Sequence, residues 1–106
     1  MNNQNIYVDI DNTITFTTGM DYKNSIPRKD RIDIINKLYD DGNIITYWTG
    51  RGTVSGIDWT VLTKNQLNEW GAKHHKLLLG KPEYDIFIDD KSFNCENYFS
   101  KFIKVT

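Results

Sequence analysis

The chain has 106 residues, of which 39% are hydrophobic, 13% aromatic and 25% charged; this is typical of a globular protein with one core and excludes fibrous and disordered classes. Thirteen Lys and Arg against fourteen Asp and Glu give a formal charge of −1, which counts against nucleic-acid binding through a general basic surface. The lone Cys95 cannot form an internal disulfide, no apolar run reaches the roughly 20 residues of a membrane span, and residues 1–5 are too polar for a signal peptide. We therefore expect a single cytoplasmic domain over residues 1–106, with no membrane partner.

The order of apolar segments predicts strands that alternate with helices. Short β-branched runs predict the strands, and apolar residues at helical spacing ahead of Gly42 and Gly71 predict two of the helices. Strands are expected at residues 6–10, 43–48, 76–79 and 85–88 with an edge strand at 102–105, helices at 28–41, 58–70 and 92–101, and an irregular polar connection at 13–25. This alternation predicts an α/β fold: a small doubly wound, mostly parallel sheet with helices on both faces, which binds ligands at the carboxyl edge of its strands.

Polar side chains follow each expected strand at its carboxyl end. Because the carboxyl ends of parallel strands meet at one edge of a sheet, these side chains should lie close together. They are Asp9 and Asp11 after the first strand, Thr49, Gly50 and Arg51 after the second, Lys81 after the third, and Asp89 and Asp90 after the fourth.

Several carboxylates at one edge also predict a metal ion. Like charges a few ångströms apart repel one another unless a cation lies among them. Carboxylate and carbonyl oxygens are the hard ligands that Mg²⁺ prefers. The adjacent His74 and His75 would point to opposite faces of a strand, which makes them poor joint ligands for zinc.

Four short motifs in this order resemble those of the haloacid dehalogenase-like (HAD) superfamily, most of whose members are phosphatases. They are D-I-D-N-T, T-G-R, G-K-P and I-D-D-K-S-F-N, and the resemblance spans residues 6–94. Within that superfamily, D-I-D-N-T-I-T and G-K-P-E-Y-D-I-F-I-D-D are most similar to small capsule-biosynthesis phosphatases. The resemblance implies a core without a cap domain and a Mg²⁺-dependent hydrolase of phosphomonoesters, acting on a sugar phosphate or related intermediate of surface-polysaccharide synthesis.

The resemblance also implies a role for each matching residue. Asp9 would be the nucleophile that forms an aspartyl-phosphate, and Asp11 the general acid and base. The implied phosphate-binding residues are Thr49, Gly50 and Lys81, the implied metal ligands are Asp9, Asp11, Asp90 and Asp89, and Arg51 is an implied substrate contact. Two positions depart from the pattern: the stretch between Lys81 and the fourth strand is too short for a helix, which leaves Lys76 and Lys91 as alternative lysines, and Asn94 stands where a second acid is common.

Without a cap, the site would be open, or closed by a neighbouring subunit of a homo-oligomer. Residues of the two short loops beside it are the candidates for selectivity toward a small phosphorylated substrate: Tyr22, Lys23, Arg28, Arg51 and Ser55. Three other functions remain open: a nucleotide or polynucleotide-end phosphatase, a phospho-accepting receiver domain, and a binding module without activity. D-N-T could also be a plain turn, because Asp, Asn and Thr side chains bond to their own backbone.

Overall fold

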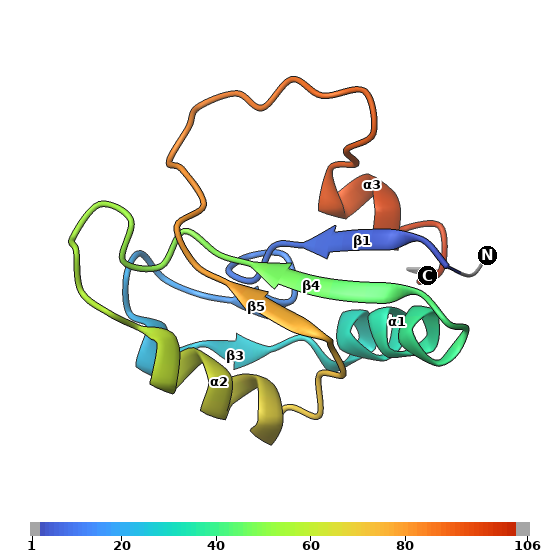
Figure 1. The fold of residues 1–106 in the computed structure, drawn as a ribbon, viewed down its shortest axis with the longest axis horizontal. Coiled ribbons are helices and arrows are strands. Elements are labelled where there is room, and N and C mark those ends of the chain that lie inside the picture. The colour runs from blue at the N-terminus through green and yellow to red at the C-terminus, as the bar shows by residue number, and fades with distance from the viewer. Residues whose placement is uncertain (1–2, 104–106) are drawn as a thin grey trace.

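A three-stranded parallel sheet forms the centre of the computed structural model, which describes residues 3–103 (Figure 1). β1 (Asn5–Val8) pairs with β4 (Ile44–Trp48), and β4 pairs with β5 (Lys76–Leu78), so β4 is the central strand. β1 and β4 are rich in β-branched and aromatic residues, which favour the pleated backbone of a strand. The first three strands expected from the sequence are confirmed, with ends that differ by one or two residues.

Two crossover helices connect these strands. α1 (Lys29–Asp40) leads from the β1 side to β4, α2 (Thr60–Glu69) leads from β4 to β5, and Figure 1 shows both below the sheet. Ile32 of α1 and Leu67 of α2 are fully buried in one cluster with Tyr47 of β4. The helices expected at residues 28–41 and 58–70 are confirmed.

The face of the sheet opposite these helices is open. Tyr7, Ile44 and Leu78 point to that face, and their side chains are 60%, 36% and 40% exposed. The α/β class and the parallel sheet are thus confirmed, whereas the two crossover helices share one face, because right-handed crossovers in one direction along a sheet place them there. Within residues 3–103, none of the helices has both the length and the apolarity needed to cross a membrane.

The connection between β1 and α1 folds into a small flap, residues 15–27. Its ends form the antiparallel strands β2 (Thr15–Phe16) and β3 (Ile26–Pro27), and its tip carries the 3₁₀ turn η1 (Tyr22–Asn24). Tyr22 points inward and packs edge-on against Trp59, with ring centroids 5.1 Å apart. The sequence predicted an irregular connection here, because a strand of two residues is too short to show the alternation of apolar and polar residues that identifies a strand.

The segment 80–94 arches away from the sheet, and the fourth strand expected at residues 85–88 is not formed (Figure 1). Ile86 and Ile88 are 76% and 93% exposed. A parallel strand needs a crossover of about a dozen residues or more to return to the amino edge of the sheet. The stretch 79–84 after β5 is too short for such a crossover, so β1 remains an edge strand.

The last described helix, α3 (Cys95–Phe99), is shorter than the one expected at residues 92–101. It starts after Asn94, whose side chain accepts a hydrogen bond from the backbone N–H of Glu96 at 2.9 Å. Glu96 in turn pairs with Arg31 of α1 at 3.0 Å, and this contact ties α3 to α1. Of the edge strand expected at residues 102–105, Phe102 and Ile103 instead bond back to Phe99, and the remainder lies outside the described residues.

Candidate functional site

A tight turn places the two motif aspartates just beyond the carboxyl end of β1. The carbonyl of Ile10 accepts hydrogen bonds from the N–H groups of Thr13 at 3.1 Å and Ile14 at 2.9 Å. Asn12 has a φ of 61°, a left-handed conformation that Asn adopts more readily than most residues, and its side-chain oxygen accepts from Thr17 N–H at 3.0 Å. The D-N-T sequence is therefore a turn, and the turn holds Asp9 and Asp11 at the sheet edge.

Asp9 is held by one cation and one hydroxyl. The ammonium of Lys81 lies 3.2 Å from Asp9 Oδ1, and the Thr13 hydroxyl donates to Asp9 Oδ2 at 2.8 Å. The Asp9 side chain remains 33% exposed, so one side of the carboxylate is open to a ligand. The alternative lysines, Lys76 and Lys91, are exposed and have no ion pair with Asp9 among the described contacts.

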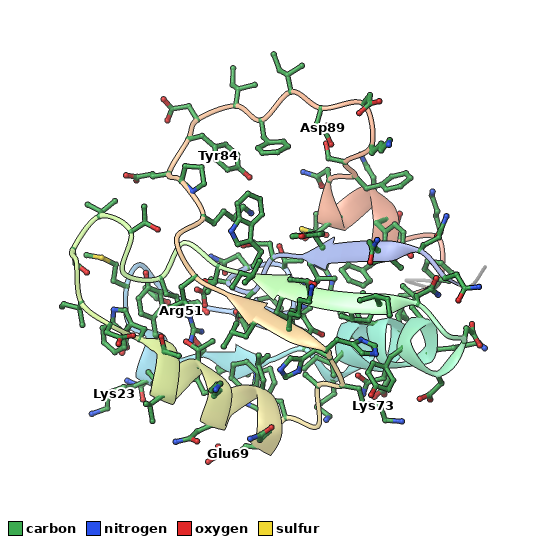
Figure 2. All side chains as sticks on the ribbon, in the orientation of Figure 1. Lys23, Arg51, Glu69, Lys73, Tyr84 and Asp89 are labelled. Atoms are coloured by element: carbon green, nitrogen blue, oxygen red, sulfur yellow. The ribbon has the colours of Figure 1, made fainter. Side chains whose placement is uncertain are left out.

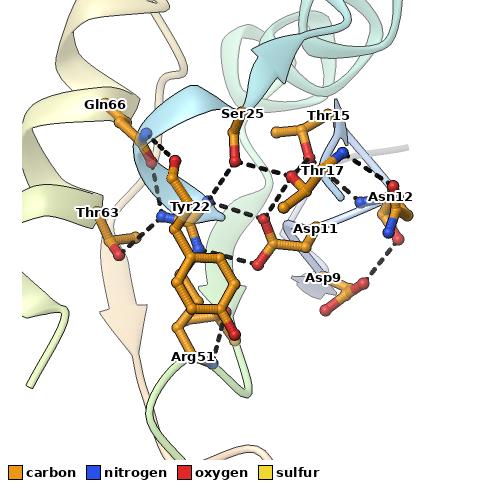
Figure 3. A network of polar contacts seen from close by, with 12 residues as sticks. Asp9, Asp11, Asn12, Thr15, Thr17, Tyr22, Ser25, Arg51, Thr63 and Gln66 are labelled. Atoms are coloured by element: carbon orange, nitrogen blue, oxygen red, sulfur yellow. Dashed lines mark hydrogen bonds and ion pairs between the residues drawn. The ribbon is translucent and has the colours of Figure 1, made fainter. Parts of the chain in front are cut away.

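Asp11 pairs with Arg51, whose side chain is completely buried (Figure 3). Arg51 Nε donates to Asp11 Oδ2 at 2.9 Å and Nη2 donates to Oδ1 at 2.8 Å, a two-point contact. Thr17 also donates its hydroxyl to Asp11 Oδ1 at 2.8 Å. The sequence pointed to Arg51 as a substrate contact, whereas in the structure its guanidinium lies inside the protein and binds Asp11.

Thr49 and Gly50 lie beside these carboxylates, as the sheet edge requires. The Thr49 backbone connects the end of β4 to the end of β5 and the residues after it. Its N–H donates to the Leu78 carbonyl at 2.9 Å, and its carbonyl accepts from the Lys81 N–H at 3.1 Å. The Thr49 hydroxyl is buried and accepts from the Arg51 N–H at 3.2 Å, which leaves its own hydrogen free to donate. Gly50 is exposed at the edge, and a Cβ there would lie 3.1 Å from the Lys81 carbonyl.

Gly52 closes the loop after β4 through a conformation that requires glycine. Its φ is +83°, and a Cβ at this position would lie 2.1 Å from the Ile57 carbonyl oxygen. A residue with a Cβ loses roughly 1–2 kcal/mol in a left-handed backbone conformation. Because the added methyl group would also meet the Ile57 carbonyl, Gly52→Ala is expected to lower the free energy of unfolding by more than this amount in a denaturant titration. Gly56→Ala is the matched control, with a φ of +77° and no atom within 4 Å of the added methyl. Equal losses for the two variants would contradict the close contact.

Asp89 and Asp90 are not brought to the site. Both lie on the exposed segment 80–94, and Figure 2 shows Asp89 on the arch above the sheet, far from Arg51. A cavity of about 870 Å³ separates this segment from β1, and Asp9 and Asp89 both line it. Within residues 3–103, no three acidic, His or Cys side chains gather closely enough to hold a metal ion. Of the four implied metal ligands, the structure thus brings together Asp9 and Asp11, and Asn94 caps α3.

A smaller cavity of about 190 Å³ lies between the flap and the loop after β4. Two of the residues expected to govern selectivity, Tyr22 and Ser55, line it together with Lys81 and Glu83. Burial, and next the negative charge of Asp11, raise the pKa of the Tyr22 hydroxyl, so this group is a neutral donor at physiological pH. Lys23 is exposed on the flap, whereas Arg28 lies over the Phe16 ring at 4.4 Å and lies close to Glu96.

Sequence reasoning missed the polar partners of the two aspartates. Thr17 of the flap, and Thr63 and Gln66 of α2, are buried and belong to the network around Arg51. The two α2 residues are three positions apart, on the same face as the core residue Leu67. Polar side chains on the buried face of a helix were the one signal that could have identified them.

Comparisons with known proteins support the fold and go no further. The chain matches no protein-family model and no curated protein. A crystal structure of a structural-genomics target from Vibrio cholerae is similar, with a TM-score of 0.83 and 24% sequence identity over 92% of this chain and 88% of that one. At this level of identity the likeness is evidence of a shared fold alone.

Proposed function

We propose that this chain is a Mg²⁺-dependent phosphomonoester hydrolase that works through an aspartyl-phosphate on Asp9. The observation that supports this most is the pairing at the sheet edge: Asp9 with Lys81 at 3.2 Å, and Asp11 with Arg51 at 2.8 Å. Asp9 is paired with Lys81 and Asp11 with Arg51, so the two carboxylates lie in different environments, as expected of a nucleophile and an acid–base group. The resemblance of D-I-D-N-T, T-G-R and G-K-P to the HAD motifs supports the same reaction.

In the first step, the partly exposed Asp9 carboxylate attacks phosphorus. The bond from Asp9 to phosphorus forms while the bond from phosphorus to the leaving oxygen breaks, and Asp11, which enters this step protonated, delivers its proton to that oxygen. Lys81, whose ammonium reaches Asp9 Oδ1, is placed to neutralise negative charge on the transferring phosphoryl group. The Thr49 hydroxyl, which has a free hydrogen, donates to a phosphoryl oxygen.

In the second step, water attacks the phosphorus of the aspartyl-phosphate. Asp11 accepts the proton of that water, the bond between phosphorus and Asp9 breaks, and inorganic phosphate leaves. The same carboxylate thus serves as acid in one step and as base in the next. Its position two residues after Asp9, on the turn that follows β1, allows both steps to occur at one phosphorus.

The donor set fits Mg²⁺, which is often held by one or two protein carboxylates together with water and substrate phosphate. The Asp9 side chain and the Asp11 backbone carbonyl would hold it, because a carboxylate that accepts from Lys81 and Thr13 still has lone pairs free. When bound, the metal neutralises charge on the phosphoryl oxygens.

The substrate we propose is a sugar phosphate or a related intermediate of surface-polysaccharide synthesis. Lys81 lines two cavities: one of about 870 Å³, which Asp9 also lines and whose size lies within the roughly 300–1,000 Å³ of ligand sites, and a smaller one of about 190 Å³. Glu83 in its wall can accept hydrogen bonds from hydroxyl groups and disfavours a second anion. A nucleotide or polynucleotide end is the alternative, against which the near-neutral charge counts.

A phosphomonoester panel, assayed with and without Mg²⁺, tests the proposed function. We expect phosphate release from one or more hexose phosphates with Mg²⁺, and loss of that release when a chelator is added. Calorimetric titration with Mg²⁺ alone gives an independent reading of metal binding. A gene neighbourhood of polysaccharide enzymes would agree with the substrate class, and a repair neighbourhood would favour the polynucleotide alternative.

Three results would count against this function. Turnover that is unaffected by removal of metal would contradict the Mg²⁺ dependence. Release from polynucleotide ends and from no hexose phosphate would replace the substrate class. Stable phosphorylation by a small phosphodonor such as acetyl phosphate, without turnover, would instead favour a receiver domain.

A further inference from the structure

We propose that Arg51 is a positioning residue for proton transfer, which fixes the orientation of the Asp11 carboxylate and has no contact with substrate. This inference rests on the proposed phosphatase function and adds a role that the sequence motif did not assign. Three observations support the inference: Arg51 is buried, each of its N–H groups has an acceptor inside the protein, and these acceptors belong to Asp11, α2 and the flap (Figure 3).

All the donors of the Arg51 guanidinium are engaged inside the protein. A guanidinium has five N–H donors. Nε donates to Asp11, Nη1 donates to Gln66 at 2.6 Å and Thr63 at 3.1 Å, and Nη2 donates to Asp11 and, at 3.4 Å, to Ser25. The side chain is 0% exposed, so no N–H is left for a substrate phosphate.

The same contacts restrict Asp11 at both of its oxygens. Oδ1 accepts from Arg51 and from the Thr17 hydroxyl, and Oδ2 accepts from Arg51 Nε. The Asp11 side chain is nevertheless 20% exposed, whereas that of Arg51 is 0% exposed. A proton-transfer group must be held close to its productive position, because a displacement of about 1 Å can cost roughly 10²-fold in rate.

The partners of Arg51 come from elements that are otherwise separate. Thr63 and Gln66 belong to α2, whereas Ser25 belongs to the flap. Gln66 also donates its side-chain amide to the Tyr22 carbonyl at 2.6 Å, and the Tyr22 ring lies 4.7 Å from the guanidinium carbon. Arg51 thus links Asp11 to α2 through Thr63 and Gln66, and to the flap through Ser25, and such contacts hold a catalytic group in place.

Arg51→Lys is the decisive substitution, because lysine keeps the positive charge but cannot make the two-point contact. We expect kcat to fall by about 10²-fold on a hexose phosphate, with KM little changed. The fall in kcat/KM, which reports the first step, should be several-fold smaller on p-nitrophenyl phosphate, whose leaving group needs little protonation. Asp11→Asn/Arg51→Lys should turn over no more slowly than Asp11→Asn alone, because residues that act as one unit are not additive.

Gln66→Met is a second variant that tests the same inference if Arg51→Lys does not fold. It removes an acceptor of Arg51 and the link to Tyr22 while leaving the Arg51 pair with Asp11, so a smaller fall with the same substrate dependence is expected. Asn43→Ala is the control: this polar side chain is also fully buried, and it bonds the Leu38 carbonyl at 2.9 Å and the Gln4 N–H at 3.1 Å at the amino end of β4, away from the site. It should lower the unfolding temperature without changing the ratio of kcat/KM on the two substrates.

The outcomes separate this inference from the function on which it rests. A raised KM with unchanged kcat in Arg51→Lys would show that Arg51 contacts substrate and would overturn the inference. A double variant slower than Asp11→Asn by the full Arg51→Lys factor would also overturn it, because the two residues would then act independently. Wild-type protein without any turnover would contradict the proposed function, and the inference with it.

Discussion

Asp9→Asn is expected to abolish turnover, with a loss of about 10⁴-fold or more in kcat. An amide is not a nucleophile for phosphorus, and it also removes the negative charge that faces Lys81 at 3.2 Å. Asparagine has nearly the same shape as aspartate and retains an oxygen that can accept from the Thr13 hydroxyl. We therefore expect a folded protein, checked by thermal unfolding, that has no measurable phosphate release under saturating substrate.

The control for this substitution is Asp33→Asn, the same chemical change at an exposed position of α1. It is expected to keep kcat within about twofold, in line with the small effects of exposed substitutions. If Asp9→Asn kept more than a tenth of the wild-type kcat, Asp9 could not be the nucleophile. The nucleophile would then have to be sought elsewhere at the same sheet edge.

Asp11→Asn is expected to lower kcat by about 10²–10⁴-fold, the usual contribution of a positioned acid or base. The loss should be greatest for alkyl phosphates, whose leaving oxygen needs a proton, and smaller for p-nitrophenyl phosphate. The variant should still bind Mg²⁺ in calorimetry, because the backbone carbonyl of residue 11 is unchanged. Its free energy of unfolding should also fall by about 1.5–3 kcal/mol, since the buried Arg51 loses its charged partner.

A comparison of two substrates distinguishes the role of Asp11 from a general structural effect. A fall in kcat/KM by the same factor for alkyl and p-nitrophenyl phosphates would mean that Asp11 does not protonate the leaving group, because kcat/KM reports the first step and not the second, which the two substrates share. Full turnover of the variant on a hexose phosphate would mean that another residue is the acid. The denaturant titration reports the structural contribution separately, because it does not depend on substrate.

The sheet and the crossover helices could be predicted because their signals are local. The apolar runs of β4 and β5 and the spacing of Ile32 and Ile35 in α1 follow from periods that a short window contains. Residues 85–88 have the same local signal, I-F-I after Asp85, yet they form no strand. A strand also requires a neighbour with which to pair, and the short stretch after β5 cannot bring these residues parallel to β1.

The part of the site that lies at the carboxyl ends of the strands could be predicted from the sequence. Asp9, Asp11, Thr49 and Lys81 meet at one sheet edge because parallel strands finish there. The partner of Asp11 was not predictable, because Arg51 is 40 residues away in the chain and its burial depends on Thr63 and Gln66 of α2. The order of the motifs predicted that Arg51 contacts substrate. In the structure α2 packs against the loop after β4, and Arg51 contacts Asp11 inside the protein.

The most direct test of the proposed mechanism is to locate the phosphoryl group on the enzyme during turnover. Wild-type protein is mixed with Mg²⁺ and a hexose phosphate that it hydrolyses, quenched in acid within the first turnover, digested and mapped by mass spectrometry. We predict a phosphoryl group on Asp9, absent from Asp9→Asn and lost from the wild type when the substrate is exhausted. A phosphoryl group on any other residue, or turnover without a phosphorylated peptide and with inverted configuration at phosphorus, would contradict the mechanism.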